Sequence, residues 1–149
     1  AASRDKVSEL VADTTARGAR VLIGGEPLDG VGYFYPPTVL ASVQPDAAIL
    51  DHEIFGPVAP LVTFRTEEEA IALANRTEFG LVSYVYTRDL QKGLRVAAAI
   101  ESGMVGLNRG LVSDVAAPFG GMKQSGLGRE GGHHGLMEFL EPQYVAVTL

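Results

Sequence analysis

Three short apolar runs, separated by segments of helical length, constrain the fold of this chain more than any other feature. The runs carry residues typical of strands and occupy residues 61–64, 81–86 and 104–107. Strands joined in this way favour parallel βαβ units, because a parallel pair needs a crossover connection. The runs are continuously apolar, as expected for strands that helices cover on both faces. The pattern therefore predicts an α/β fold with a mostly parallel sheet flanked by helices.

The segments between these runs carry helix start signals. Thr66 is followed three positions later by Glu69, which is the spacing of a capping box, and the helix it begins is expected to run to about Asn75. Asp89 is the expected N-cap of a second helix that continues through Ile100. Both predicted helices fall between predicted strands, which strengthens the βαβ interpretation.

The flanking segments add elements at both ends. Before the first run we expect a helix that ends at Gly18 and is buried along Val7, Leu10, Val11 and Thr14. A short buried strand is expected at residues 19–23. A strand-like segment is expected at 33–43, whose two prolines confine its first half to an edge or to an irregular extended segment. At the other end we expect a short helix around residues 136–139 and an alternating strand at 143–149, with no obvious partner within the chain.

Composition excludes several classes of protein. The 149 residues carry a net charge of −6, which argues against a nucleic-acid footprint, and no apolar run is long enough to span a membrane. The first ten residues are too charged for a signal peptide, so a cytoplasmic location is expected. The sequence contains no cysteine, which removes disulfides, thiolate metal sites and a cysteine nucleophile from these residues.

Several motifs favour structural interpretations over catalytic ones. Residues 126–131 match G-x-G-x-x-G. The dinucleotide fingerprint requires a strand directly before this motif, and a polar loop precedes it here. His133 and His134 are adjacent and cannot chelate a metal together at helical spacing, so no metal site is expected. A hydrolase that uses Ser113 or Ser125 with one of these histidines stays open as a minor alternative, although neither serine lies in a nucleophile elbow.

Two short segments have side chains suited to ligand binding. Glu53 lies two residues before Phe55, and a carboxylate can accept bonds from both ribose hydroxyls while a phenyl face packs on a flat ring. Phe119 lies in a region, residues 103–135, that holds ten of the 18 glycines, and an exposed ring there could line an apolar funnel. A solvated acid and core phenylalanines are the structural alternatives.

Together these segments resemble the C-terminal part of the aldehyde dehydrogenase superfamily over essentially the whole chain. The motifs occur in the family's order: residues 53–57 (EIFGP), 74–75 (AN), 79–81 (FGL), 86–90 (YTRDL), 118–121 (PFGG) and 125–130 (SGLGRE). Within the superfamily, GLVS at residues 110–113 ahead of APFGG and MKQSGLGREGG is most similar to the succinate-semialdehyde dehydrogenase group.

The resemblance implies a reaction and a set of residues. A cysteine thiolate attacks the aldehyde, the thiohemiacetal gives hydride to NAD or NADP, and water hydrolyses the thioester. By position, Glu53 would hold the nicotinamide ribose and Phe55 would pack beside the nicotinamide. Phe119 would line the aldehyde channel, Ser113 would bind the distal carboxylate of the substrate, and Glu130 would be a possible proton relay.

Arg109 is four residues from Ser113 and could support the same carboxylate. This is an interpretation of charge and proximity, because the family resemblance does not include Arg109.

The chain is shorter than family members and begins downstream of the nucleophile, so we interpret it as a fragment. Residues 1–138 would be the C-terminal part of the catalytic domain, and residues 139–149 an oligomerisation strand. The partners of this chain would be the missing N-terminal part of the same enzyme and further copies of the enzyme in a homo-oligomer. Alone it would neither turn over aldehyde nor bind cofactor tightly, and the exposed apolar surface would favour association. The alternative is a non-enzymatic module that pairs with a full-length subunit.

Overall fold

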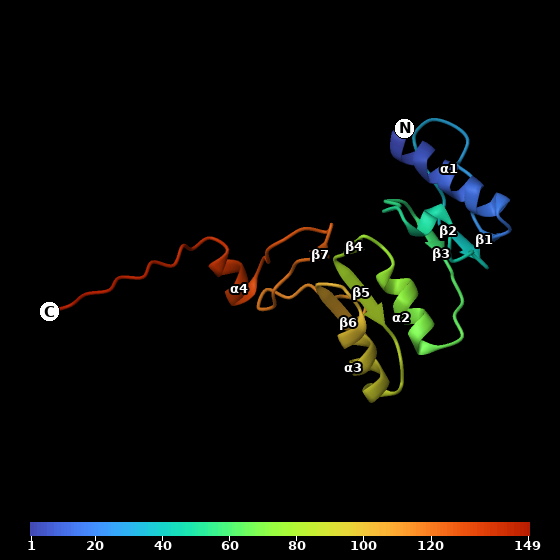
Figure 1. The fold of residues 1–149 in the computed structure, drawn as a ribbon. Helices are drawn as coiled ribbons and strands as arrows, with labels where there is room; N and C mark the ends of the chain where they lie inside the picture. Colours follow the sequence, from blue (N-terminus) through green and yellow to red (C-terminus); the bar gives the residue numbers. More distant parts are fainter. The chain divides into compact units, whose positions relative to one another are not determined.

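The computed structural model describes residues 1–149 and is a mixed α/β structure, which confirms the predicted class. The chain divides into two compact units, Ala1–Leu73 and Ala74–Leu149, and each is described by itself. Figure 1 labels their elements along the chain. None of the helices is both long and apolar enough to cross a membrane.

The first unit consists of a helix and a small three-stranded sheet. Its helices are α1 (Ala2–Ala16) and the short 3-10 turn η1 (Ala48–Leu50). The sheet has the order β1 (Arg20–Ile23), β2 (Thr38–Ala41) and β3 (Val58–Pro60), with β2 antiparallel to β1 and parallel to β3. The two prolines before β2 lie outside any strand, as predicted.

The core of this unit lies between α1, β2 and η1. The predicted buried face of α1 is confirmed: Val7, Leu10, Val11 and Thr14 are all buried. Leu40 of β2 and Ile49 of η1 pack in the same cluster. The Thr14 hydroxyl donates to the Leu10 carbonyl, 2.6 Å away, so its burial leaves no unpaired polar atom.

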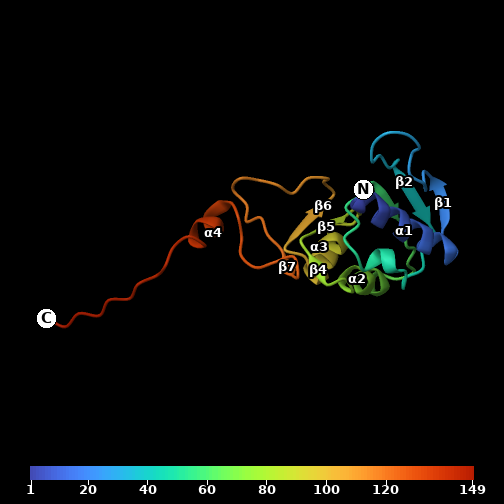
Figure 2. The ribbon, with the colours of Figure 1, turned by 90° about the horizontal axis from the view of Figure 1, so that it is seen from above.

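The second unit contains one βαβ motif and a long loop region. Figure 2 shows α3 (Leu90–Ala99) beside β5 (Val82–Val85) and β6 (Met104–Leu107), which pair in parallel as the sequence predicts. The other elements are β4 (Phe79–Gly80), β7 (Met122–Lys123) and α4 (Gly132–Met137), with β4 antiparallel to β7. Helix α2 (Glu67–Asn75) lies mostly in the first unit and ends in the second.

The predicted helix starts are confirmed. The Asp89 carboxylate accepts a hydrogen bond from the Lys92 amide, 3.0 Å away, at the start of α3. The Thr66 hydroxyl accepts from the Glu69 amide at 3.2 Å, and the Glu69 carboxylate accepts in turn from the Arg65 amide at 2.8 Å. The carboxylate thus reaches one residue further back than in the standard capping box.

The sheets differ from the sequence prediction in three ways. There are three small sheets instead of one mostly parallel sheet. The strand expected at residues 61–64 lies at Val58–Pro60, because its ladder with β2 ends where the Leu61 amide donates to Leu40. The strand expected to be buried at residues 19–23 forms at Arg20–Ile23 but is exposed, since β1 is the edge of its sheet.

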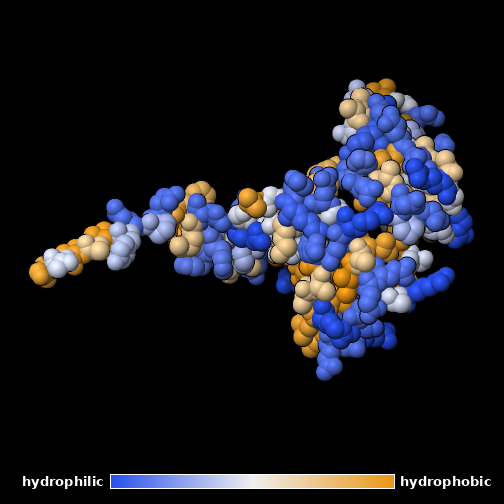
Figure 3. All heavy atoms as spheres, viewed as in Figure 1, coloured by the Kyte–Doolittle hydropathy of each residue, from blue (hydrophilic) through white to orange (hydrophobic).

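The C-terminal segment also differs from expectation. The short helix expected around residues 136–139 is α4, which begins earlier, at Gly132; both Gly132 and its N-cap, Gly131, have positive φ. Residues 141–149 form no strand within this chain and run away from α4 as an extended segment (Figure 1). Figure 3 shows apolar residues at the end of this segment, where Tyr144, Val145, Val147 and Leu149 are exposed.

Candidate functional site

The loop after β6 is held at its start by an asparagine. Asn108 has a positive φ of 54°, a conformation that asparagine tolerates better than most residues. Its side chain donates to the Thr87 carbonyl at 2.8 Å and accepts from the Thr87 amide at 2.9 Å. The loop that carries Arg109 and Ser113 therefore leaves the sheet from a fixed point.

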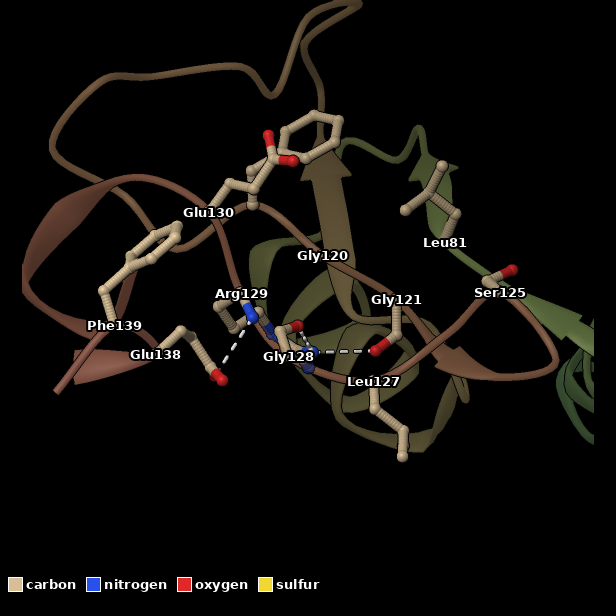
Figure 4. A pocket seen from close by; sticks show the side chains of 11 residues that line it. Leu81, Gly120, Gly121, Ser125, Leu127, Gly128, Arg129, Glu130, Glu138 and Phe139 are labelled. Carbon is tan, nitrogen blue, oxygen red and sulfur yellow. Dashed lines mark hydrogen bonds between the residues drawn. The ribbon is translucent and has the colours of Figure 1, made fainter. Parts of the chain in front are cut away.

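The glycine-rich segment, residues 118–130, packs against itself so closely that side chains are excluded at some of its glycines. A Cβ at Gly120 would lie 2.6 Å from the Gly128 carbonyl oxygen, and one at Gly121 would lie 2.6 Å from the Ser125 Cβ. The Arg129 guanidinium donates to the Gly121 and Gly128 carbonyls at 2.8 and 2.7 Å (Figure 4). Close backbone approach explains the glycines here.

Phe119 and Glu130 form a hydrogen-bonded antiparallel pair. The Phe119 amide donates to the Glu130 carbonyl and the Glu130 amide to the Phe119 carbonyl, both at 2.7 Å. Residues paired in this way project their side chains from the same face of the ladder. The structure thus brings together the predicted wall of the aldehyde channel and the predicted proton-relay carboxylate.

A cavity of about 370 Å³ lies beside this pair, and all of its lining residues belong to the second unit. Its walls include both members of the pair together with Leu81, Ser125, Leu127 and Phe139. Figure 4 shows Phe139 and Glu138 projecting into this region from the segment that follows α4. Leu127 and Phe139 remain 99% and 88% exposed, so the apolar rim of the cavity is uncovered in this chain.

Phe119 also lines a second cavity of about 230 Å³. Met104, Arg109, Val112 and Asp114 contribute to its walls, so Arg109 and Phe119 line the same cavity. Ser113 is exposed on the same loop but does not line either cavity. The Asp114 carboxylate accepts from the Ala116 amide at 2.9 Å and shapes the turn that leads to Pro118.

The predicted cofactor residues lie in the first unit, on the loop between η1 and β3. Glu53 is exposed, and its main-chain carbonyl accepts a hydrogen bond from the Lys6 amine at 2.8 Å. Phe55 is 81% exposed with a φ of 46°. At Gly56 a Cβ would lie 2.6 Å from a Val7 methyl, so a larger residue there would have to displace Val7 or the loop. An open carboxylate and an open ring, two residues apart, fit a ribose and a flat heterocycle.

The serine hydrolase alternative loses support at Ser125. Its hydroxyl accepts a hydrogen bond from the Gly80 amide at 2.9 Å and joins the glycine-rich segment to β4. His133 and His134 contact each other edge to face, with ring centroids 6.4 Å apart. No group of three potential metal ligands gathers in the structure.

Two residues that the sequence analysis did not single out also shape the site. Lys123 makes polar contacts with residues far away in sequence, and Glu138 accepts from the Arg129 amide at 3.2 Å. The positive charge in an otherwise glycine-rich segment was the available signal for Lys123, but its partners are set by tertiary structure.

Comparison with known proteins identifies the family. Residues 1–145 match the aldehyde dehydrogenase family model. A succinate-semialdehyde dehydrogenase of Paenarthrobacter nicotinovorans is 57% identical over 98% of this chain and 32% of its own length. A glutarate-semialdehyde dehydrogenase of Pseudomonas putida is 49% identical over 97% of this chain and 30% of its own length. The crystal structure of an NADP-dependent enzyme of Escherichia coli superposes with a TM-score of 0.95 at 47% identity, covering 99% of this chain and 31% of that one.

The family model and the relatives match this mixed α/β chain over nearly its whole length, so the chain belongs to a family of oxidoreductases. The chain is a member of the aldehyde dehydrogenase family. It spans about a third of the length of the curated relatives it matches.

Proposed function

We propose that this chain supplies the aldehyde-binding wall and part of the nicotinamide-binding surface of a succinate-semialdehyde dehydrogenase. The parent enzyme would oxidise succinate semialdehyde to succinate with NAD or NADP, in the cytoplasm. The observation that carries the proposal is the Phe119–Glu130 pair beside an apolar cavity, in a chain 57% identical to an enzyme of that name.

The chemistry divides between this chain and other polypeptide. Residues 1–149 contain no cysteine, so the attacking thiolate would come from outside them. A bound nicotinamide cofactor supplies the hydride acceptor. Phe119 would form an apolar wall that shields the reacting aldehyde from water, and the exposed Glu130 carboxylate would pass a proton between that region and solvent. The chain alone would have no dehydrogenase activity.

Glu53 and Phe55 would hold the cofactor. Both side chains are exposed on a loop whose backbone is fixed at Glu53 by Lys6 and at Gly56 by the close approach of Val7. The carboxylate can accept from two ribose hydroxyls, and the ring can pack against the nicotinamide. A fixed backbone limits the ordering that binding must impose.

Ser113 and Arg109 would bind the distal carboxylate of the substrate. Both lie on the loop that leads to Phe119, and Arg109 lines the cavity on one side of that ring. A hydroxyl and a guanidinium are suitable donors to a carboxylate. The relatives named for succinate and glutarate semialdehydes both act on aldehydes with such a group at the far end.

The remaining elements would complete an assembled enzyme. Residues 1–138 would pack as the C-terminal part of a catalytic domain, with the small parallel pairs β2–β3 and β5–β6 joining a larger sheet. Residues 139–149 would form a strand with a neighbouring subunit, which is supported by their exposed alternating side chains. The same tail would serve a non-enzymatic module that pairs with a full-length subunit.

A hybrid enzyme tests the proposal. The 146-residue matching segment of the 57% identical relative would be replaced by the corresponding segment of this chain, and turnover would be followed by nicotinamide absorbance. We expect turnover of succinate semialdehyde, and loss of preference over an uncharged aldehyde of equal length on Ser113→Ala with Arg109→Gln. A hybrid that folds and binds cofactor but does not oxidise succinate semialdehyde would contradict the proposal, and turnover by the 149-residue chain alone would contradict the division of chemistry.

A further inference from the structure

The side-chain amine of Lys123 links the glycine-rich segment to other parts of the second unit through several polar contacts. Its Nζ donates to the carbonyl oxygens of Asn75 at 2.8 Å and Thr77 at 3.1 Å, and lies 2.7 Å from a Glu101 carboxylate oxygen. Asn75 is the last residue of α2, so the amine satisfies a carbonyl at the negative end of that helix.

The Asn75 side chain extends the same set of contacts to α3. Its amide nitrogen donates to the carbonyl of Ala99, the last residue of α3, at 2.9 Å. Its amide oxygen accepts from the Glu101 main-chain amide at 2.8 Å. The ends of α2 and α3 and the glycine-rich segment therefore meet at three residues, Asn75, Glu101 and Lys123, which we call the Lys123 cluster.

The backbone at Lys123 adopts a conformation that lysine disfavours. Its φ is 54°, in the left-handed region that side chains other than glycine, asparagine and aspartate rarely occupy. Such backbone persists where the surroundings fix it, and here the amine contacts and the β4–β7 ladder do so. Contacts that hold a disfavoured conformation point to a positioning role.

Lys123 is close in sequence to both members of the Phe119–Glu130 pair, and hydrogen bonds anchor the backbone between them. Lys123 pairs with Phe79 in the β4–β7 ladder, and Ser125 accepts from Gly80 two residues later. Phe119 precedes Lys123 by four residues and Glu130 follows it by seven. Little free backbone separates the anchored part of the segment from the pair that lines the cavity.

We propose that Lys123 is a positioning residue: through Asn75, Thr77 and Glu101 it holds the glycine-rich segment so that Phe119 and Glu130 stay paired beside the aldehyde cavity. The proposal rests on the proposed function only for what the cavity binds. The amine acts on the loop and does not touch substrate.

Amide hydrogen exchange in the full 149-residue chain tests the positioning itself. The Phe119 and Glu130 amides each donate within the pair, so they report directly on its opening. Lys123→Met keeps most of the stem and removes the donor, and we expect exchange at both amides to accelerate on the order of tenfold. Amides of β2, in the other unit, should be unchanged, and Lys123→Arg should retain most of the protection.

Two controls keep the test decisive. Lys92→Met removes an exposed lysine on α3 and should leave both amides unaffected. Glu101→Gln removes one charged partner while the Asn75 and Thr77 acceptors remain, so a smaller acceleration is expected even if Lys123→Met does not fold. Unchanged exchange at Phe119 and Glu130 in both variants, or acceleration spread equally over both units, would overturn the proposal.

The hybrid enzyme adds a kinetic measurement. Because the cofactor residues lie in the first unit, Lys123→Met should raise KM for the aldehyde several-fold and leave KM for the nicotinamide cofactor unchanged. An equal rise in both constants would contradict a positioning role. An inactive parent hybrid would instead count against the proposed function, and the exchange measurement would still decide the role of Lys123.

Discussion

The two units of this chain are held together in different ways. All eight buried apolar side chains of the core, among them Val11, Leu40 and Ile49, belong to the first unit. In the second unit the buried residues are all glycines, at positions 80, 93, 106, 121 and 135. The first unit therefore has a side-chain core of its own, whereas the second relies on backbone contacts and polar bridges and exposes apolar side chains such as Leu94 and Phe139.

The largest expected effect concerns the core of the first unit. Leu40 is fully buried between α1, β2 and η1, so Leu40→Ala should lower the free energy of unfolding by about 2–5 kcal/mol. Leu94→Ala in α3, where the side chain is largely exposed, is the matched control and should cost less than about 1 kcal/mol. Urea titration followed by circular dichroism measures both, and similar losses would remove the distinction between the units.

The second effect concerns the buried glycines. A Cβ at Gly80 would lie 2.6 Å from the Glu101 carbonyl oxygen, so Gly80→Ala forces the backbone apart and should destabilise the unit by about 1–3 kcal/mol. At Gly110 the nearest atom would be the Tyr86 hydroxyl at 3.6 Å, so Gly110→Ala should be almost neutral. Thermal unfolding distinguishes the two, and a neutral Gly80→Ala would show that close backbone approach does not hold this unit.

The third prediction tests a local interaction in the second unit. Asp89→Ala removes the side-chain acceptor of the Lys92 amide and should cost about 1 kcal/mol. Asp89→Asn keeps an acceptor and should recover most of that loss. Amide exchange at Lys92 reports the cap directly, and unchanged exchange in the alanine variant would contradict the assigned role.

The smallest expected effect depends on pH and lies in the first unit. Burial, and then the charge of Glu26, raise the pKa of Tyr35, whose hydroxyl donates to the Gly25 carbonyl at 2.9 Å. Because the folded state favours the neutral phenol, this stabilisation is complete below the ordinary pKa of tyrosine and is lost as the pH rises through the raised value. Tyr35→Phe should cost about 0.5–1.5 kcal/mol at neutral pH.

The free energy of unfolding, measured once at neutral pH and once at a pH above the ordinary tyrosine pKa, gives this contribution. The difference between Tyr35→Phe and the unsubstituted chain should shrink at the higher pH. A difference that grows with pH would mean that the sign is wrong.

Local signals in the sequence predicted the helices better than the sheets. Thr66 and Asp89 act within four residues of themselves, so both helix starts were predicted correctly. Strand positions depend on partners distant in sequence, so β3 lies earlier than expected, and β1 is exposed because it forms the edge of its sheet.

In the candidate site, too, local features could be predicted from the sequence and contacts between distant residues could not. Motifs pointed to Phe119 and Glu130 separately, but their pairing depends on how the glycine-rich segment folds back on itself. Lys123 was not foreseen, because its acceptors are 46 and 48 residues away. The roles of Glu53, Phe55 and Ser113 stay predictions, since their exposed side chains make no contact here that identifies a ligand.

The buried glycines of the second unit have a consequence for assembly. Glycine loses more conformational entropy on folding than any other residue, and the glycine-rich part of this unit returns little hydrophobic free energy of its own. Its order therefore depends on the polar contacts of the Lys123 cluster and on any surface that covers it. In a longer chain that covers this segment, burying the segment and ordering it would be coupled, so incorrect assembly would disorder the Phe119–Glu130 pair before it disordered the helices.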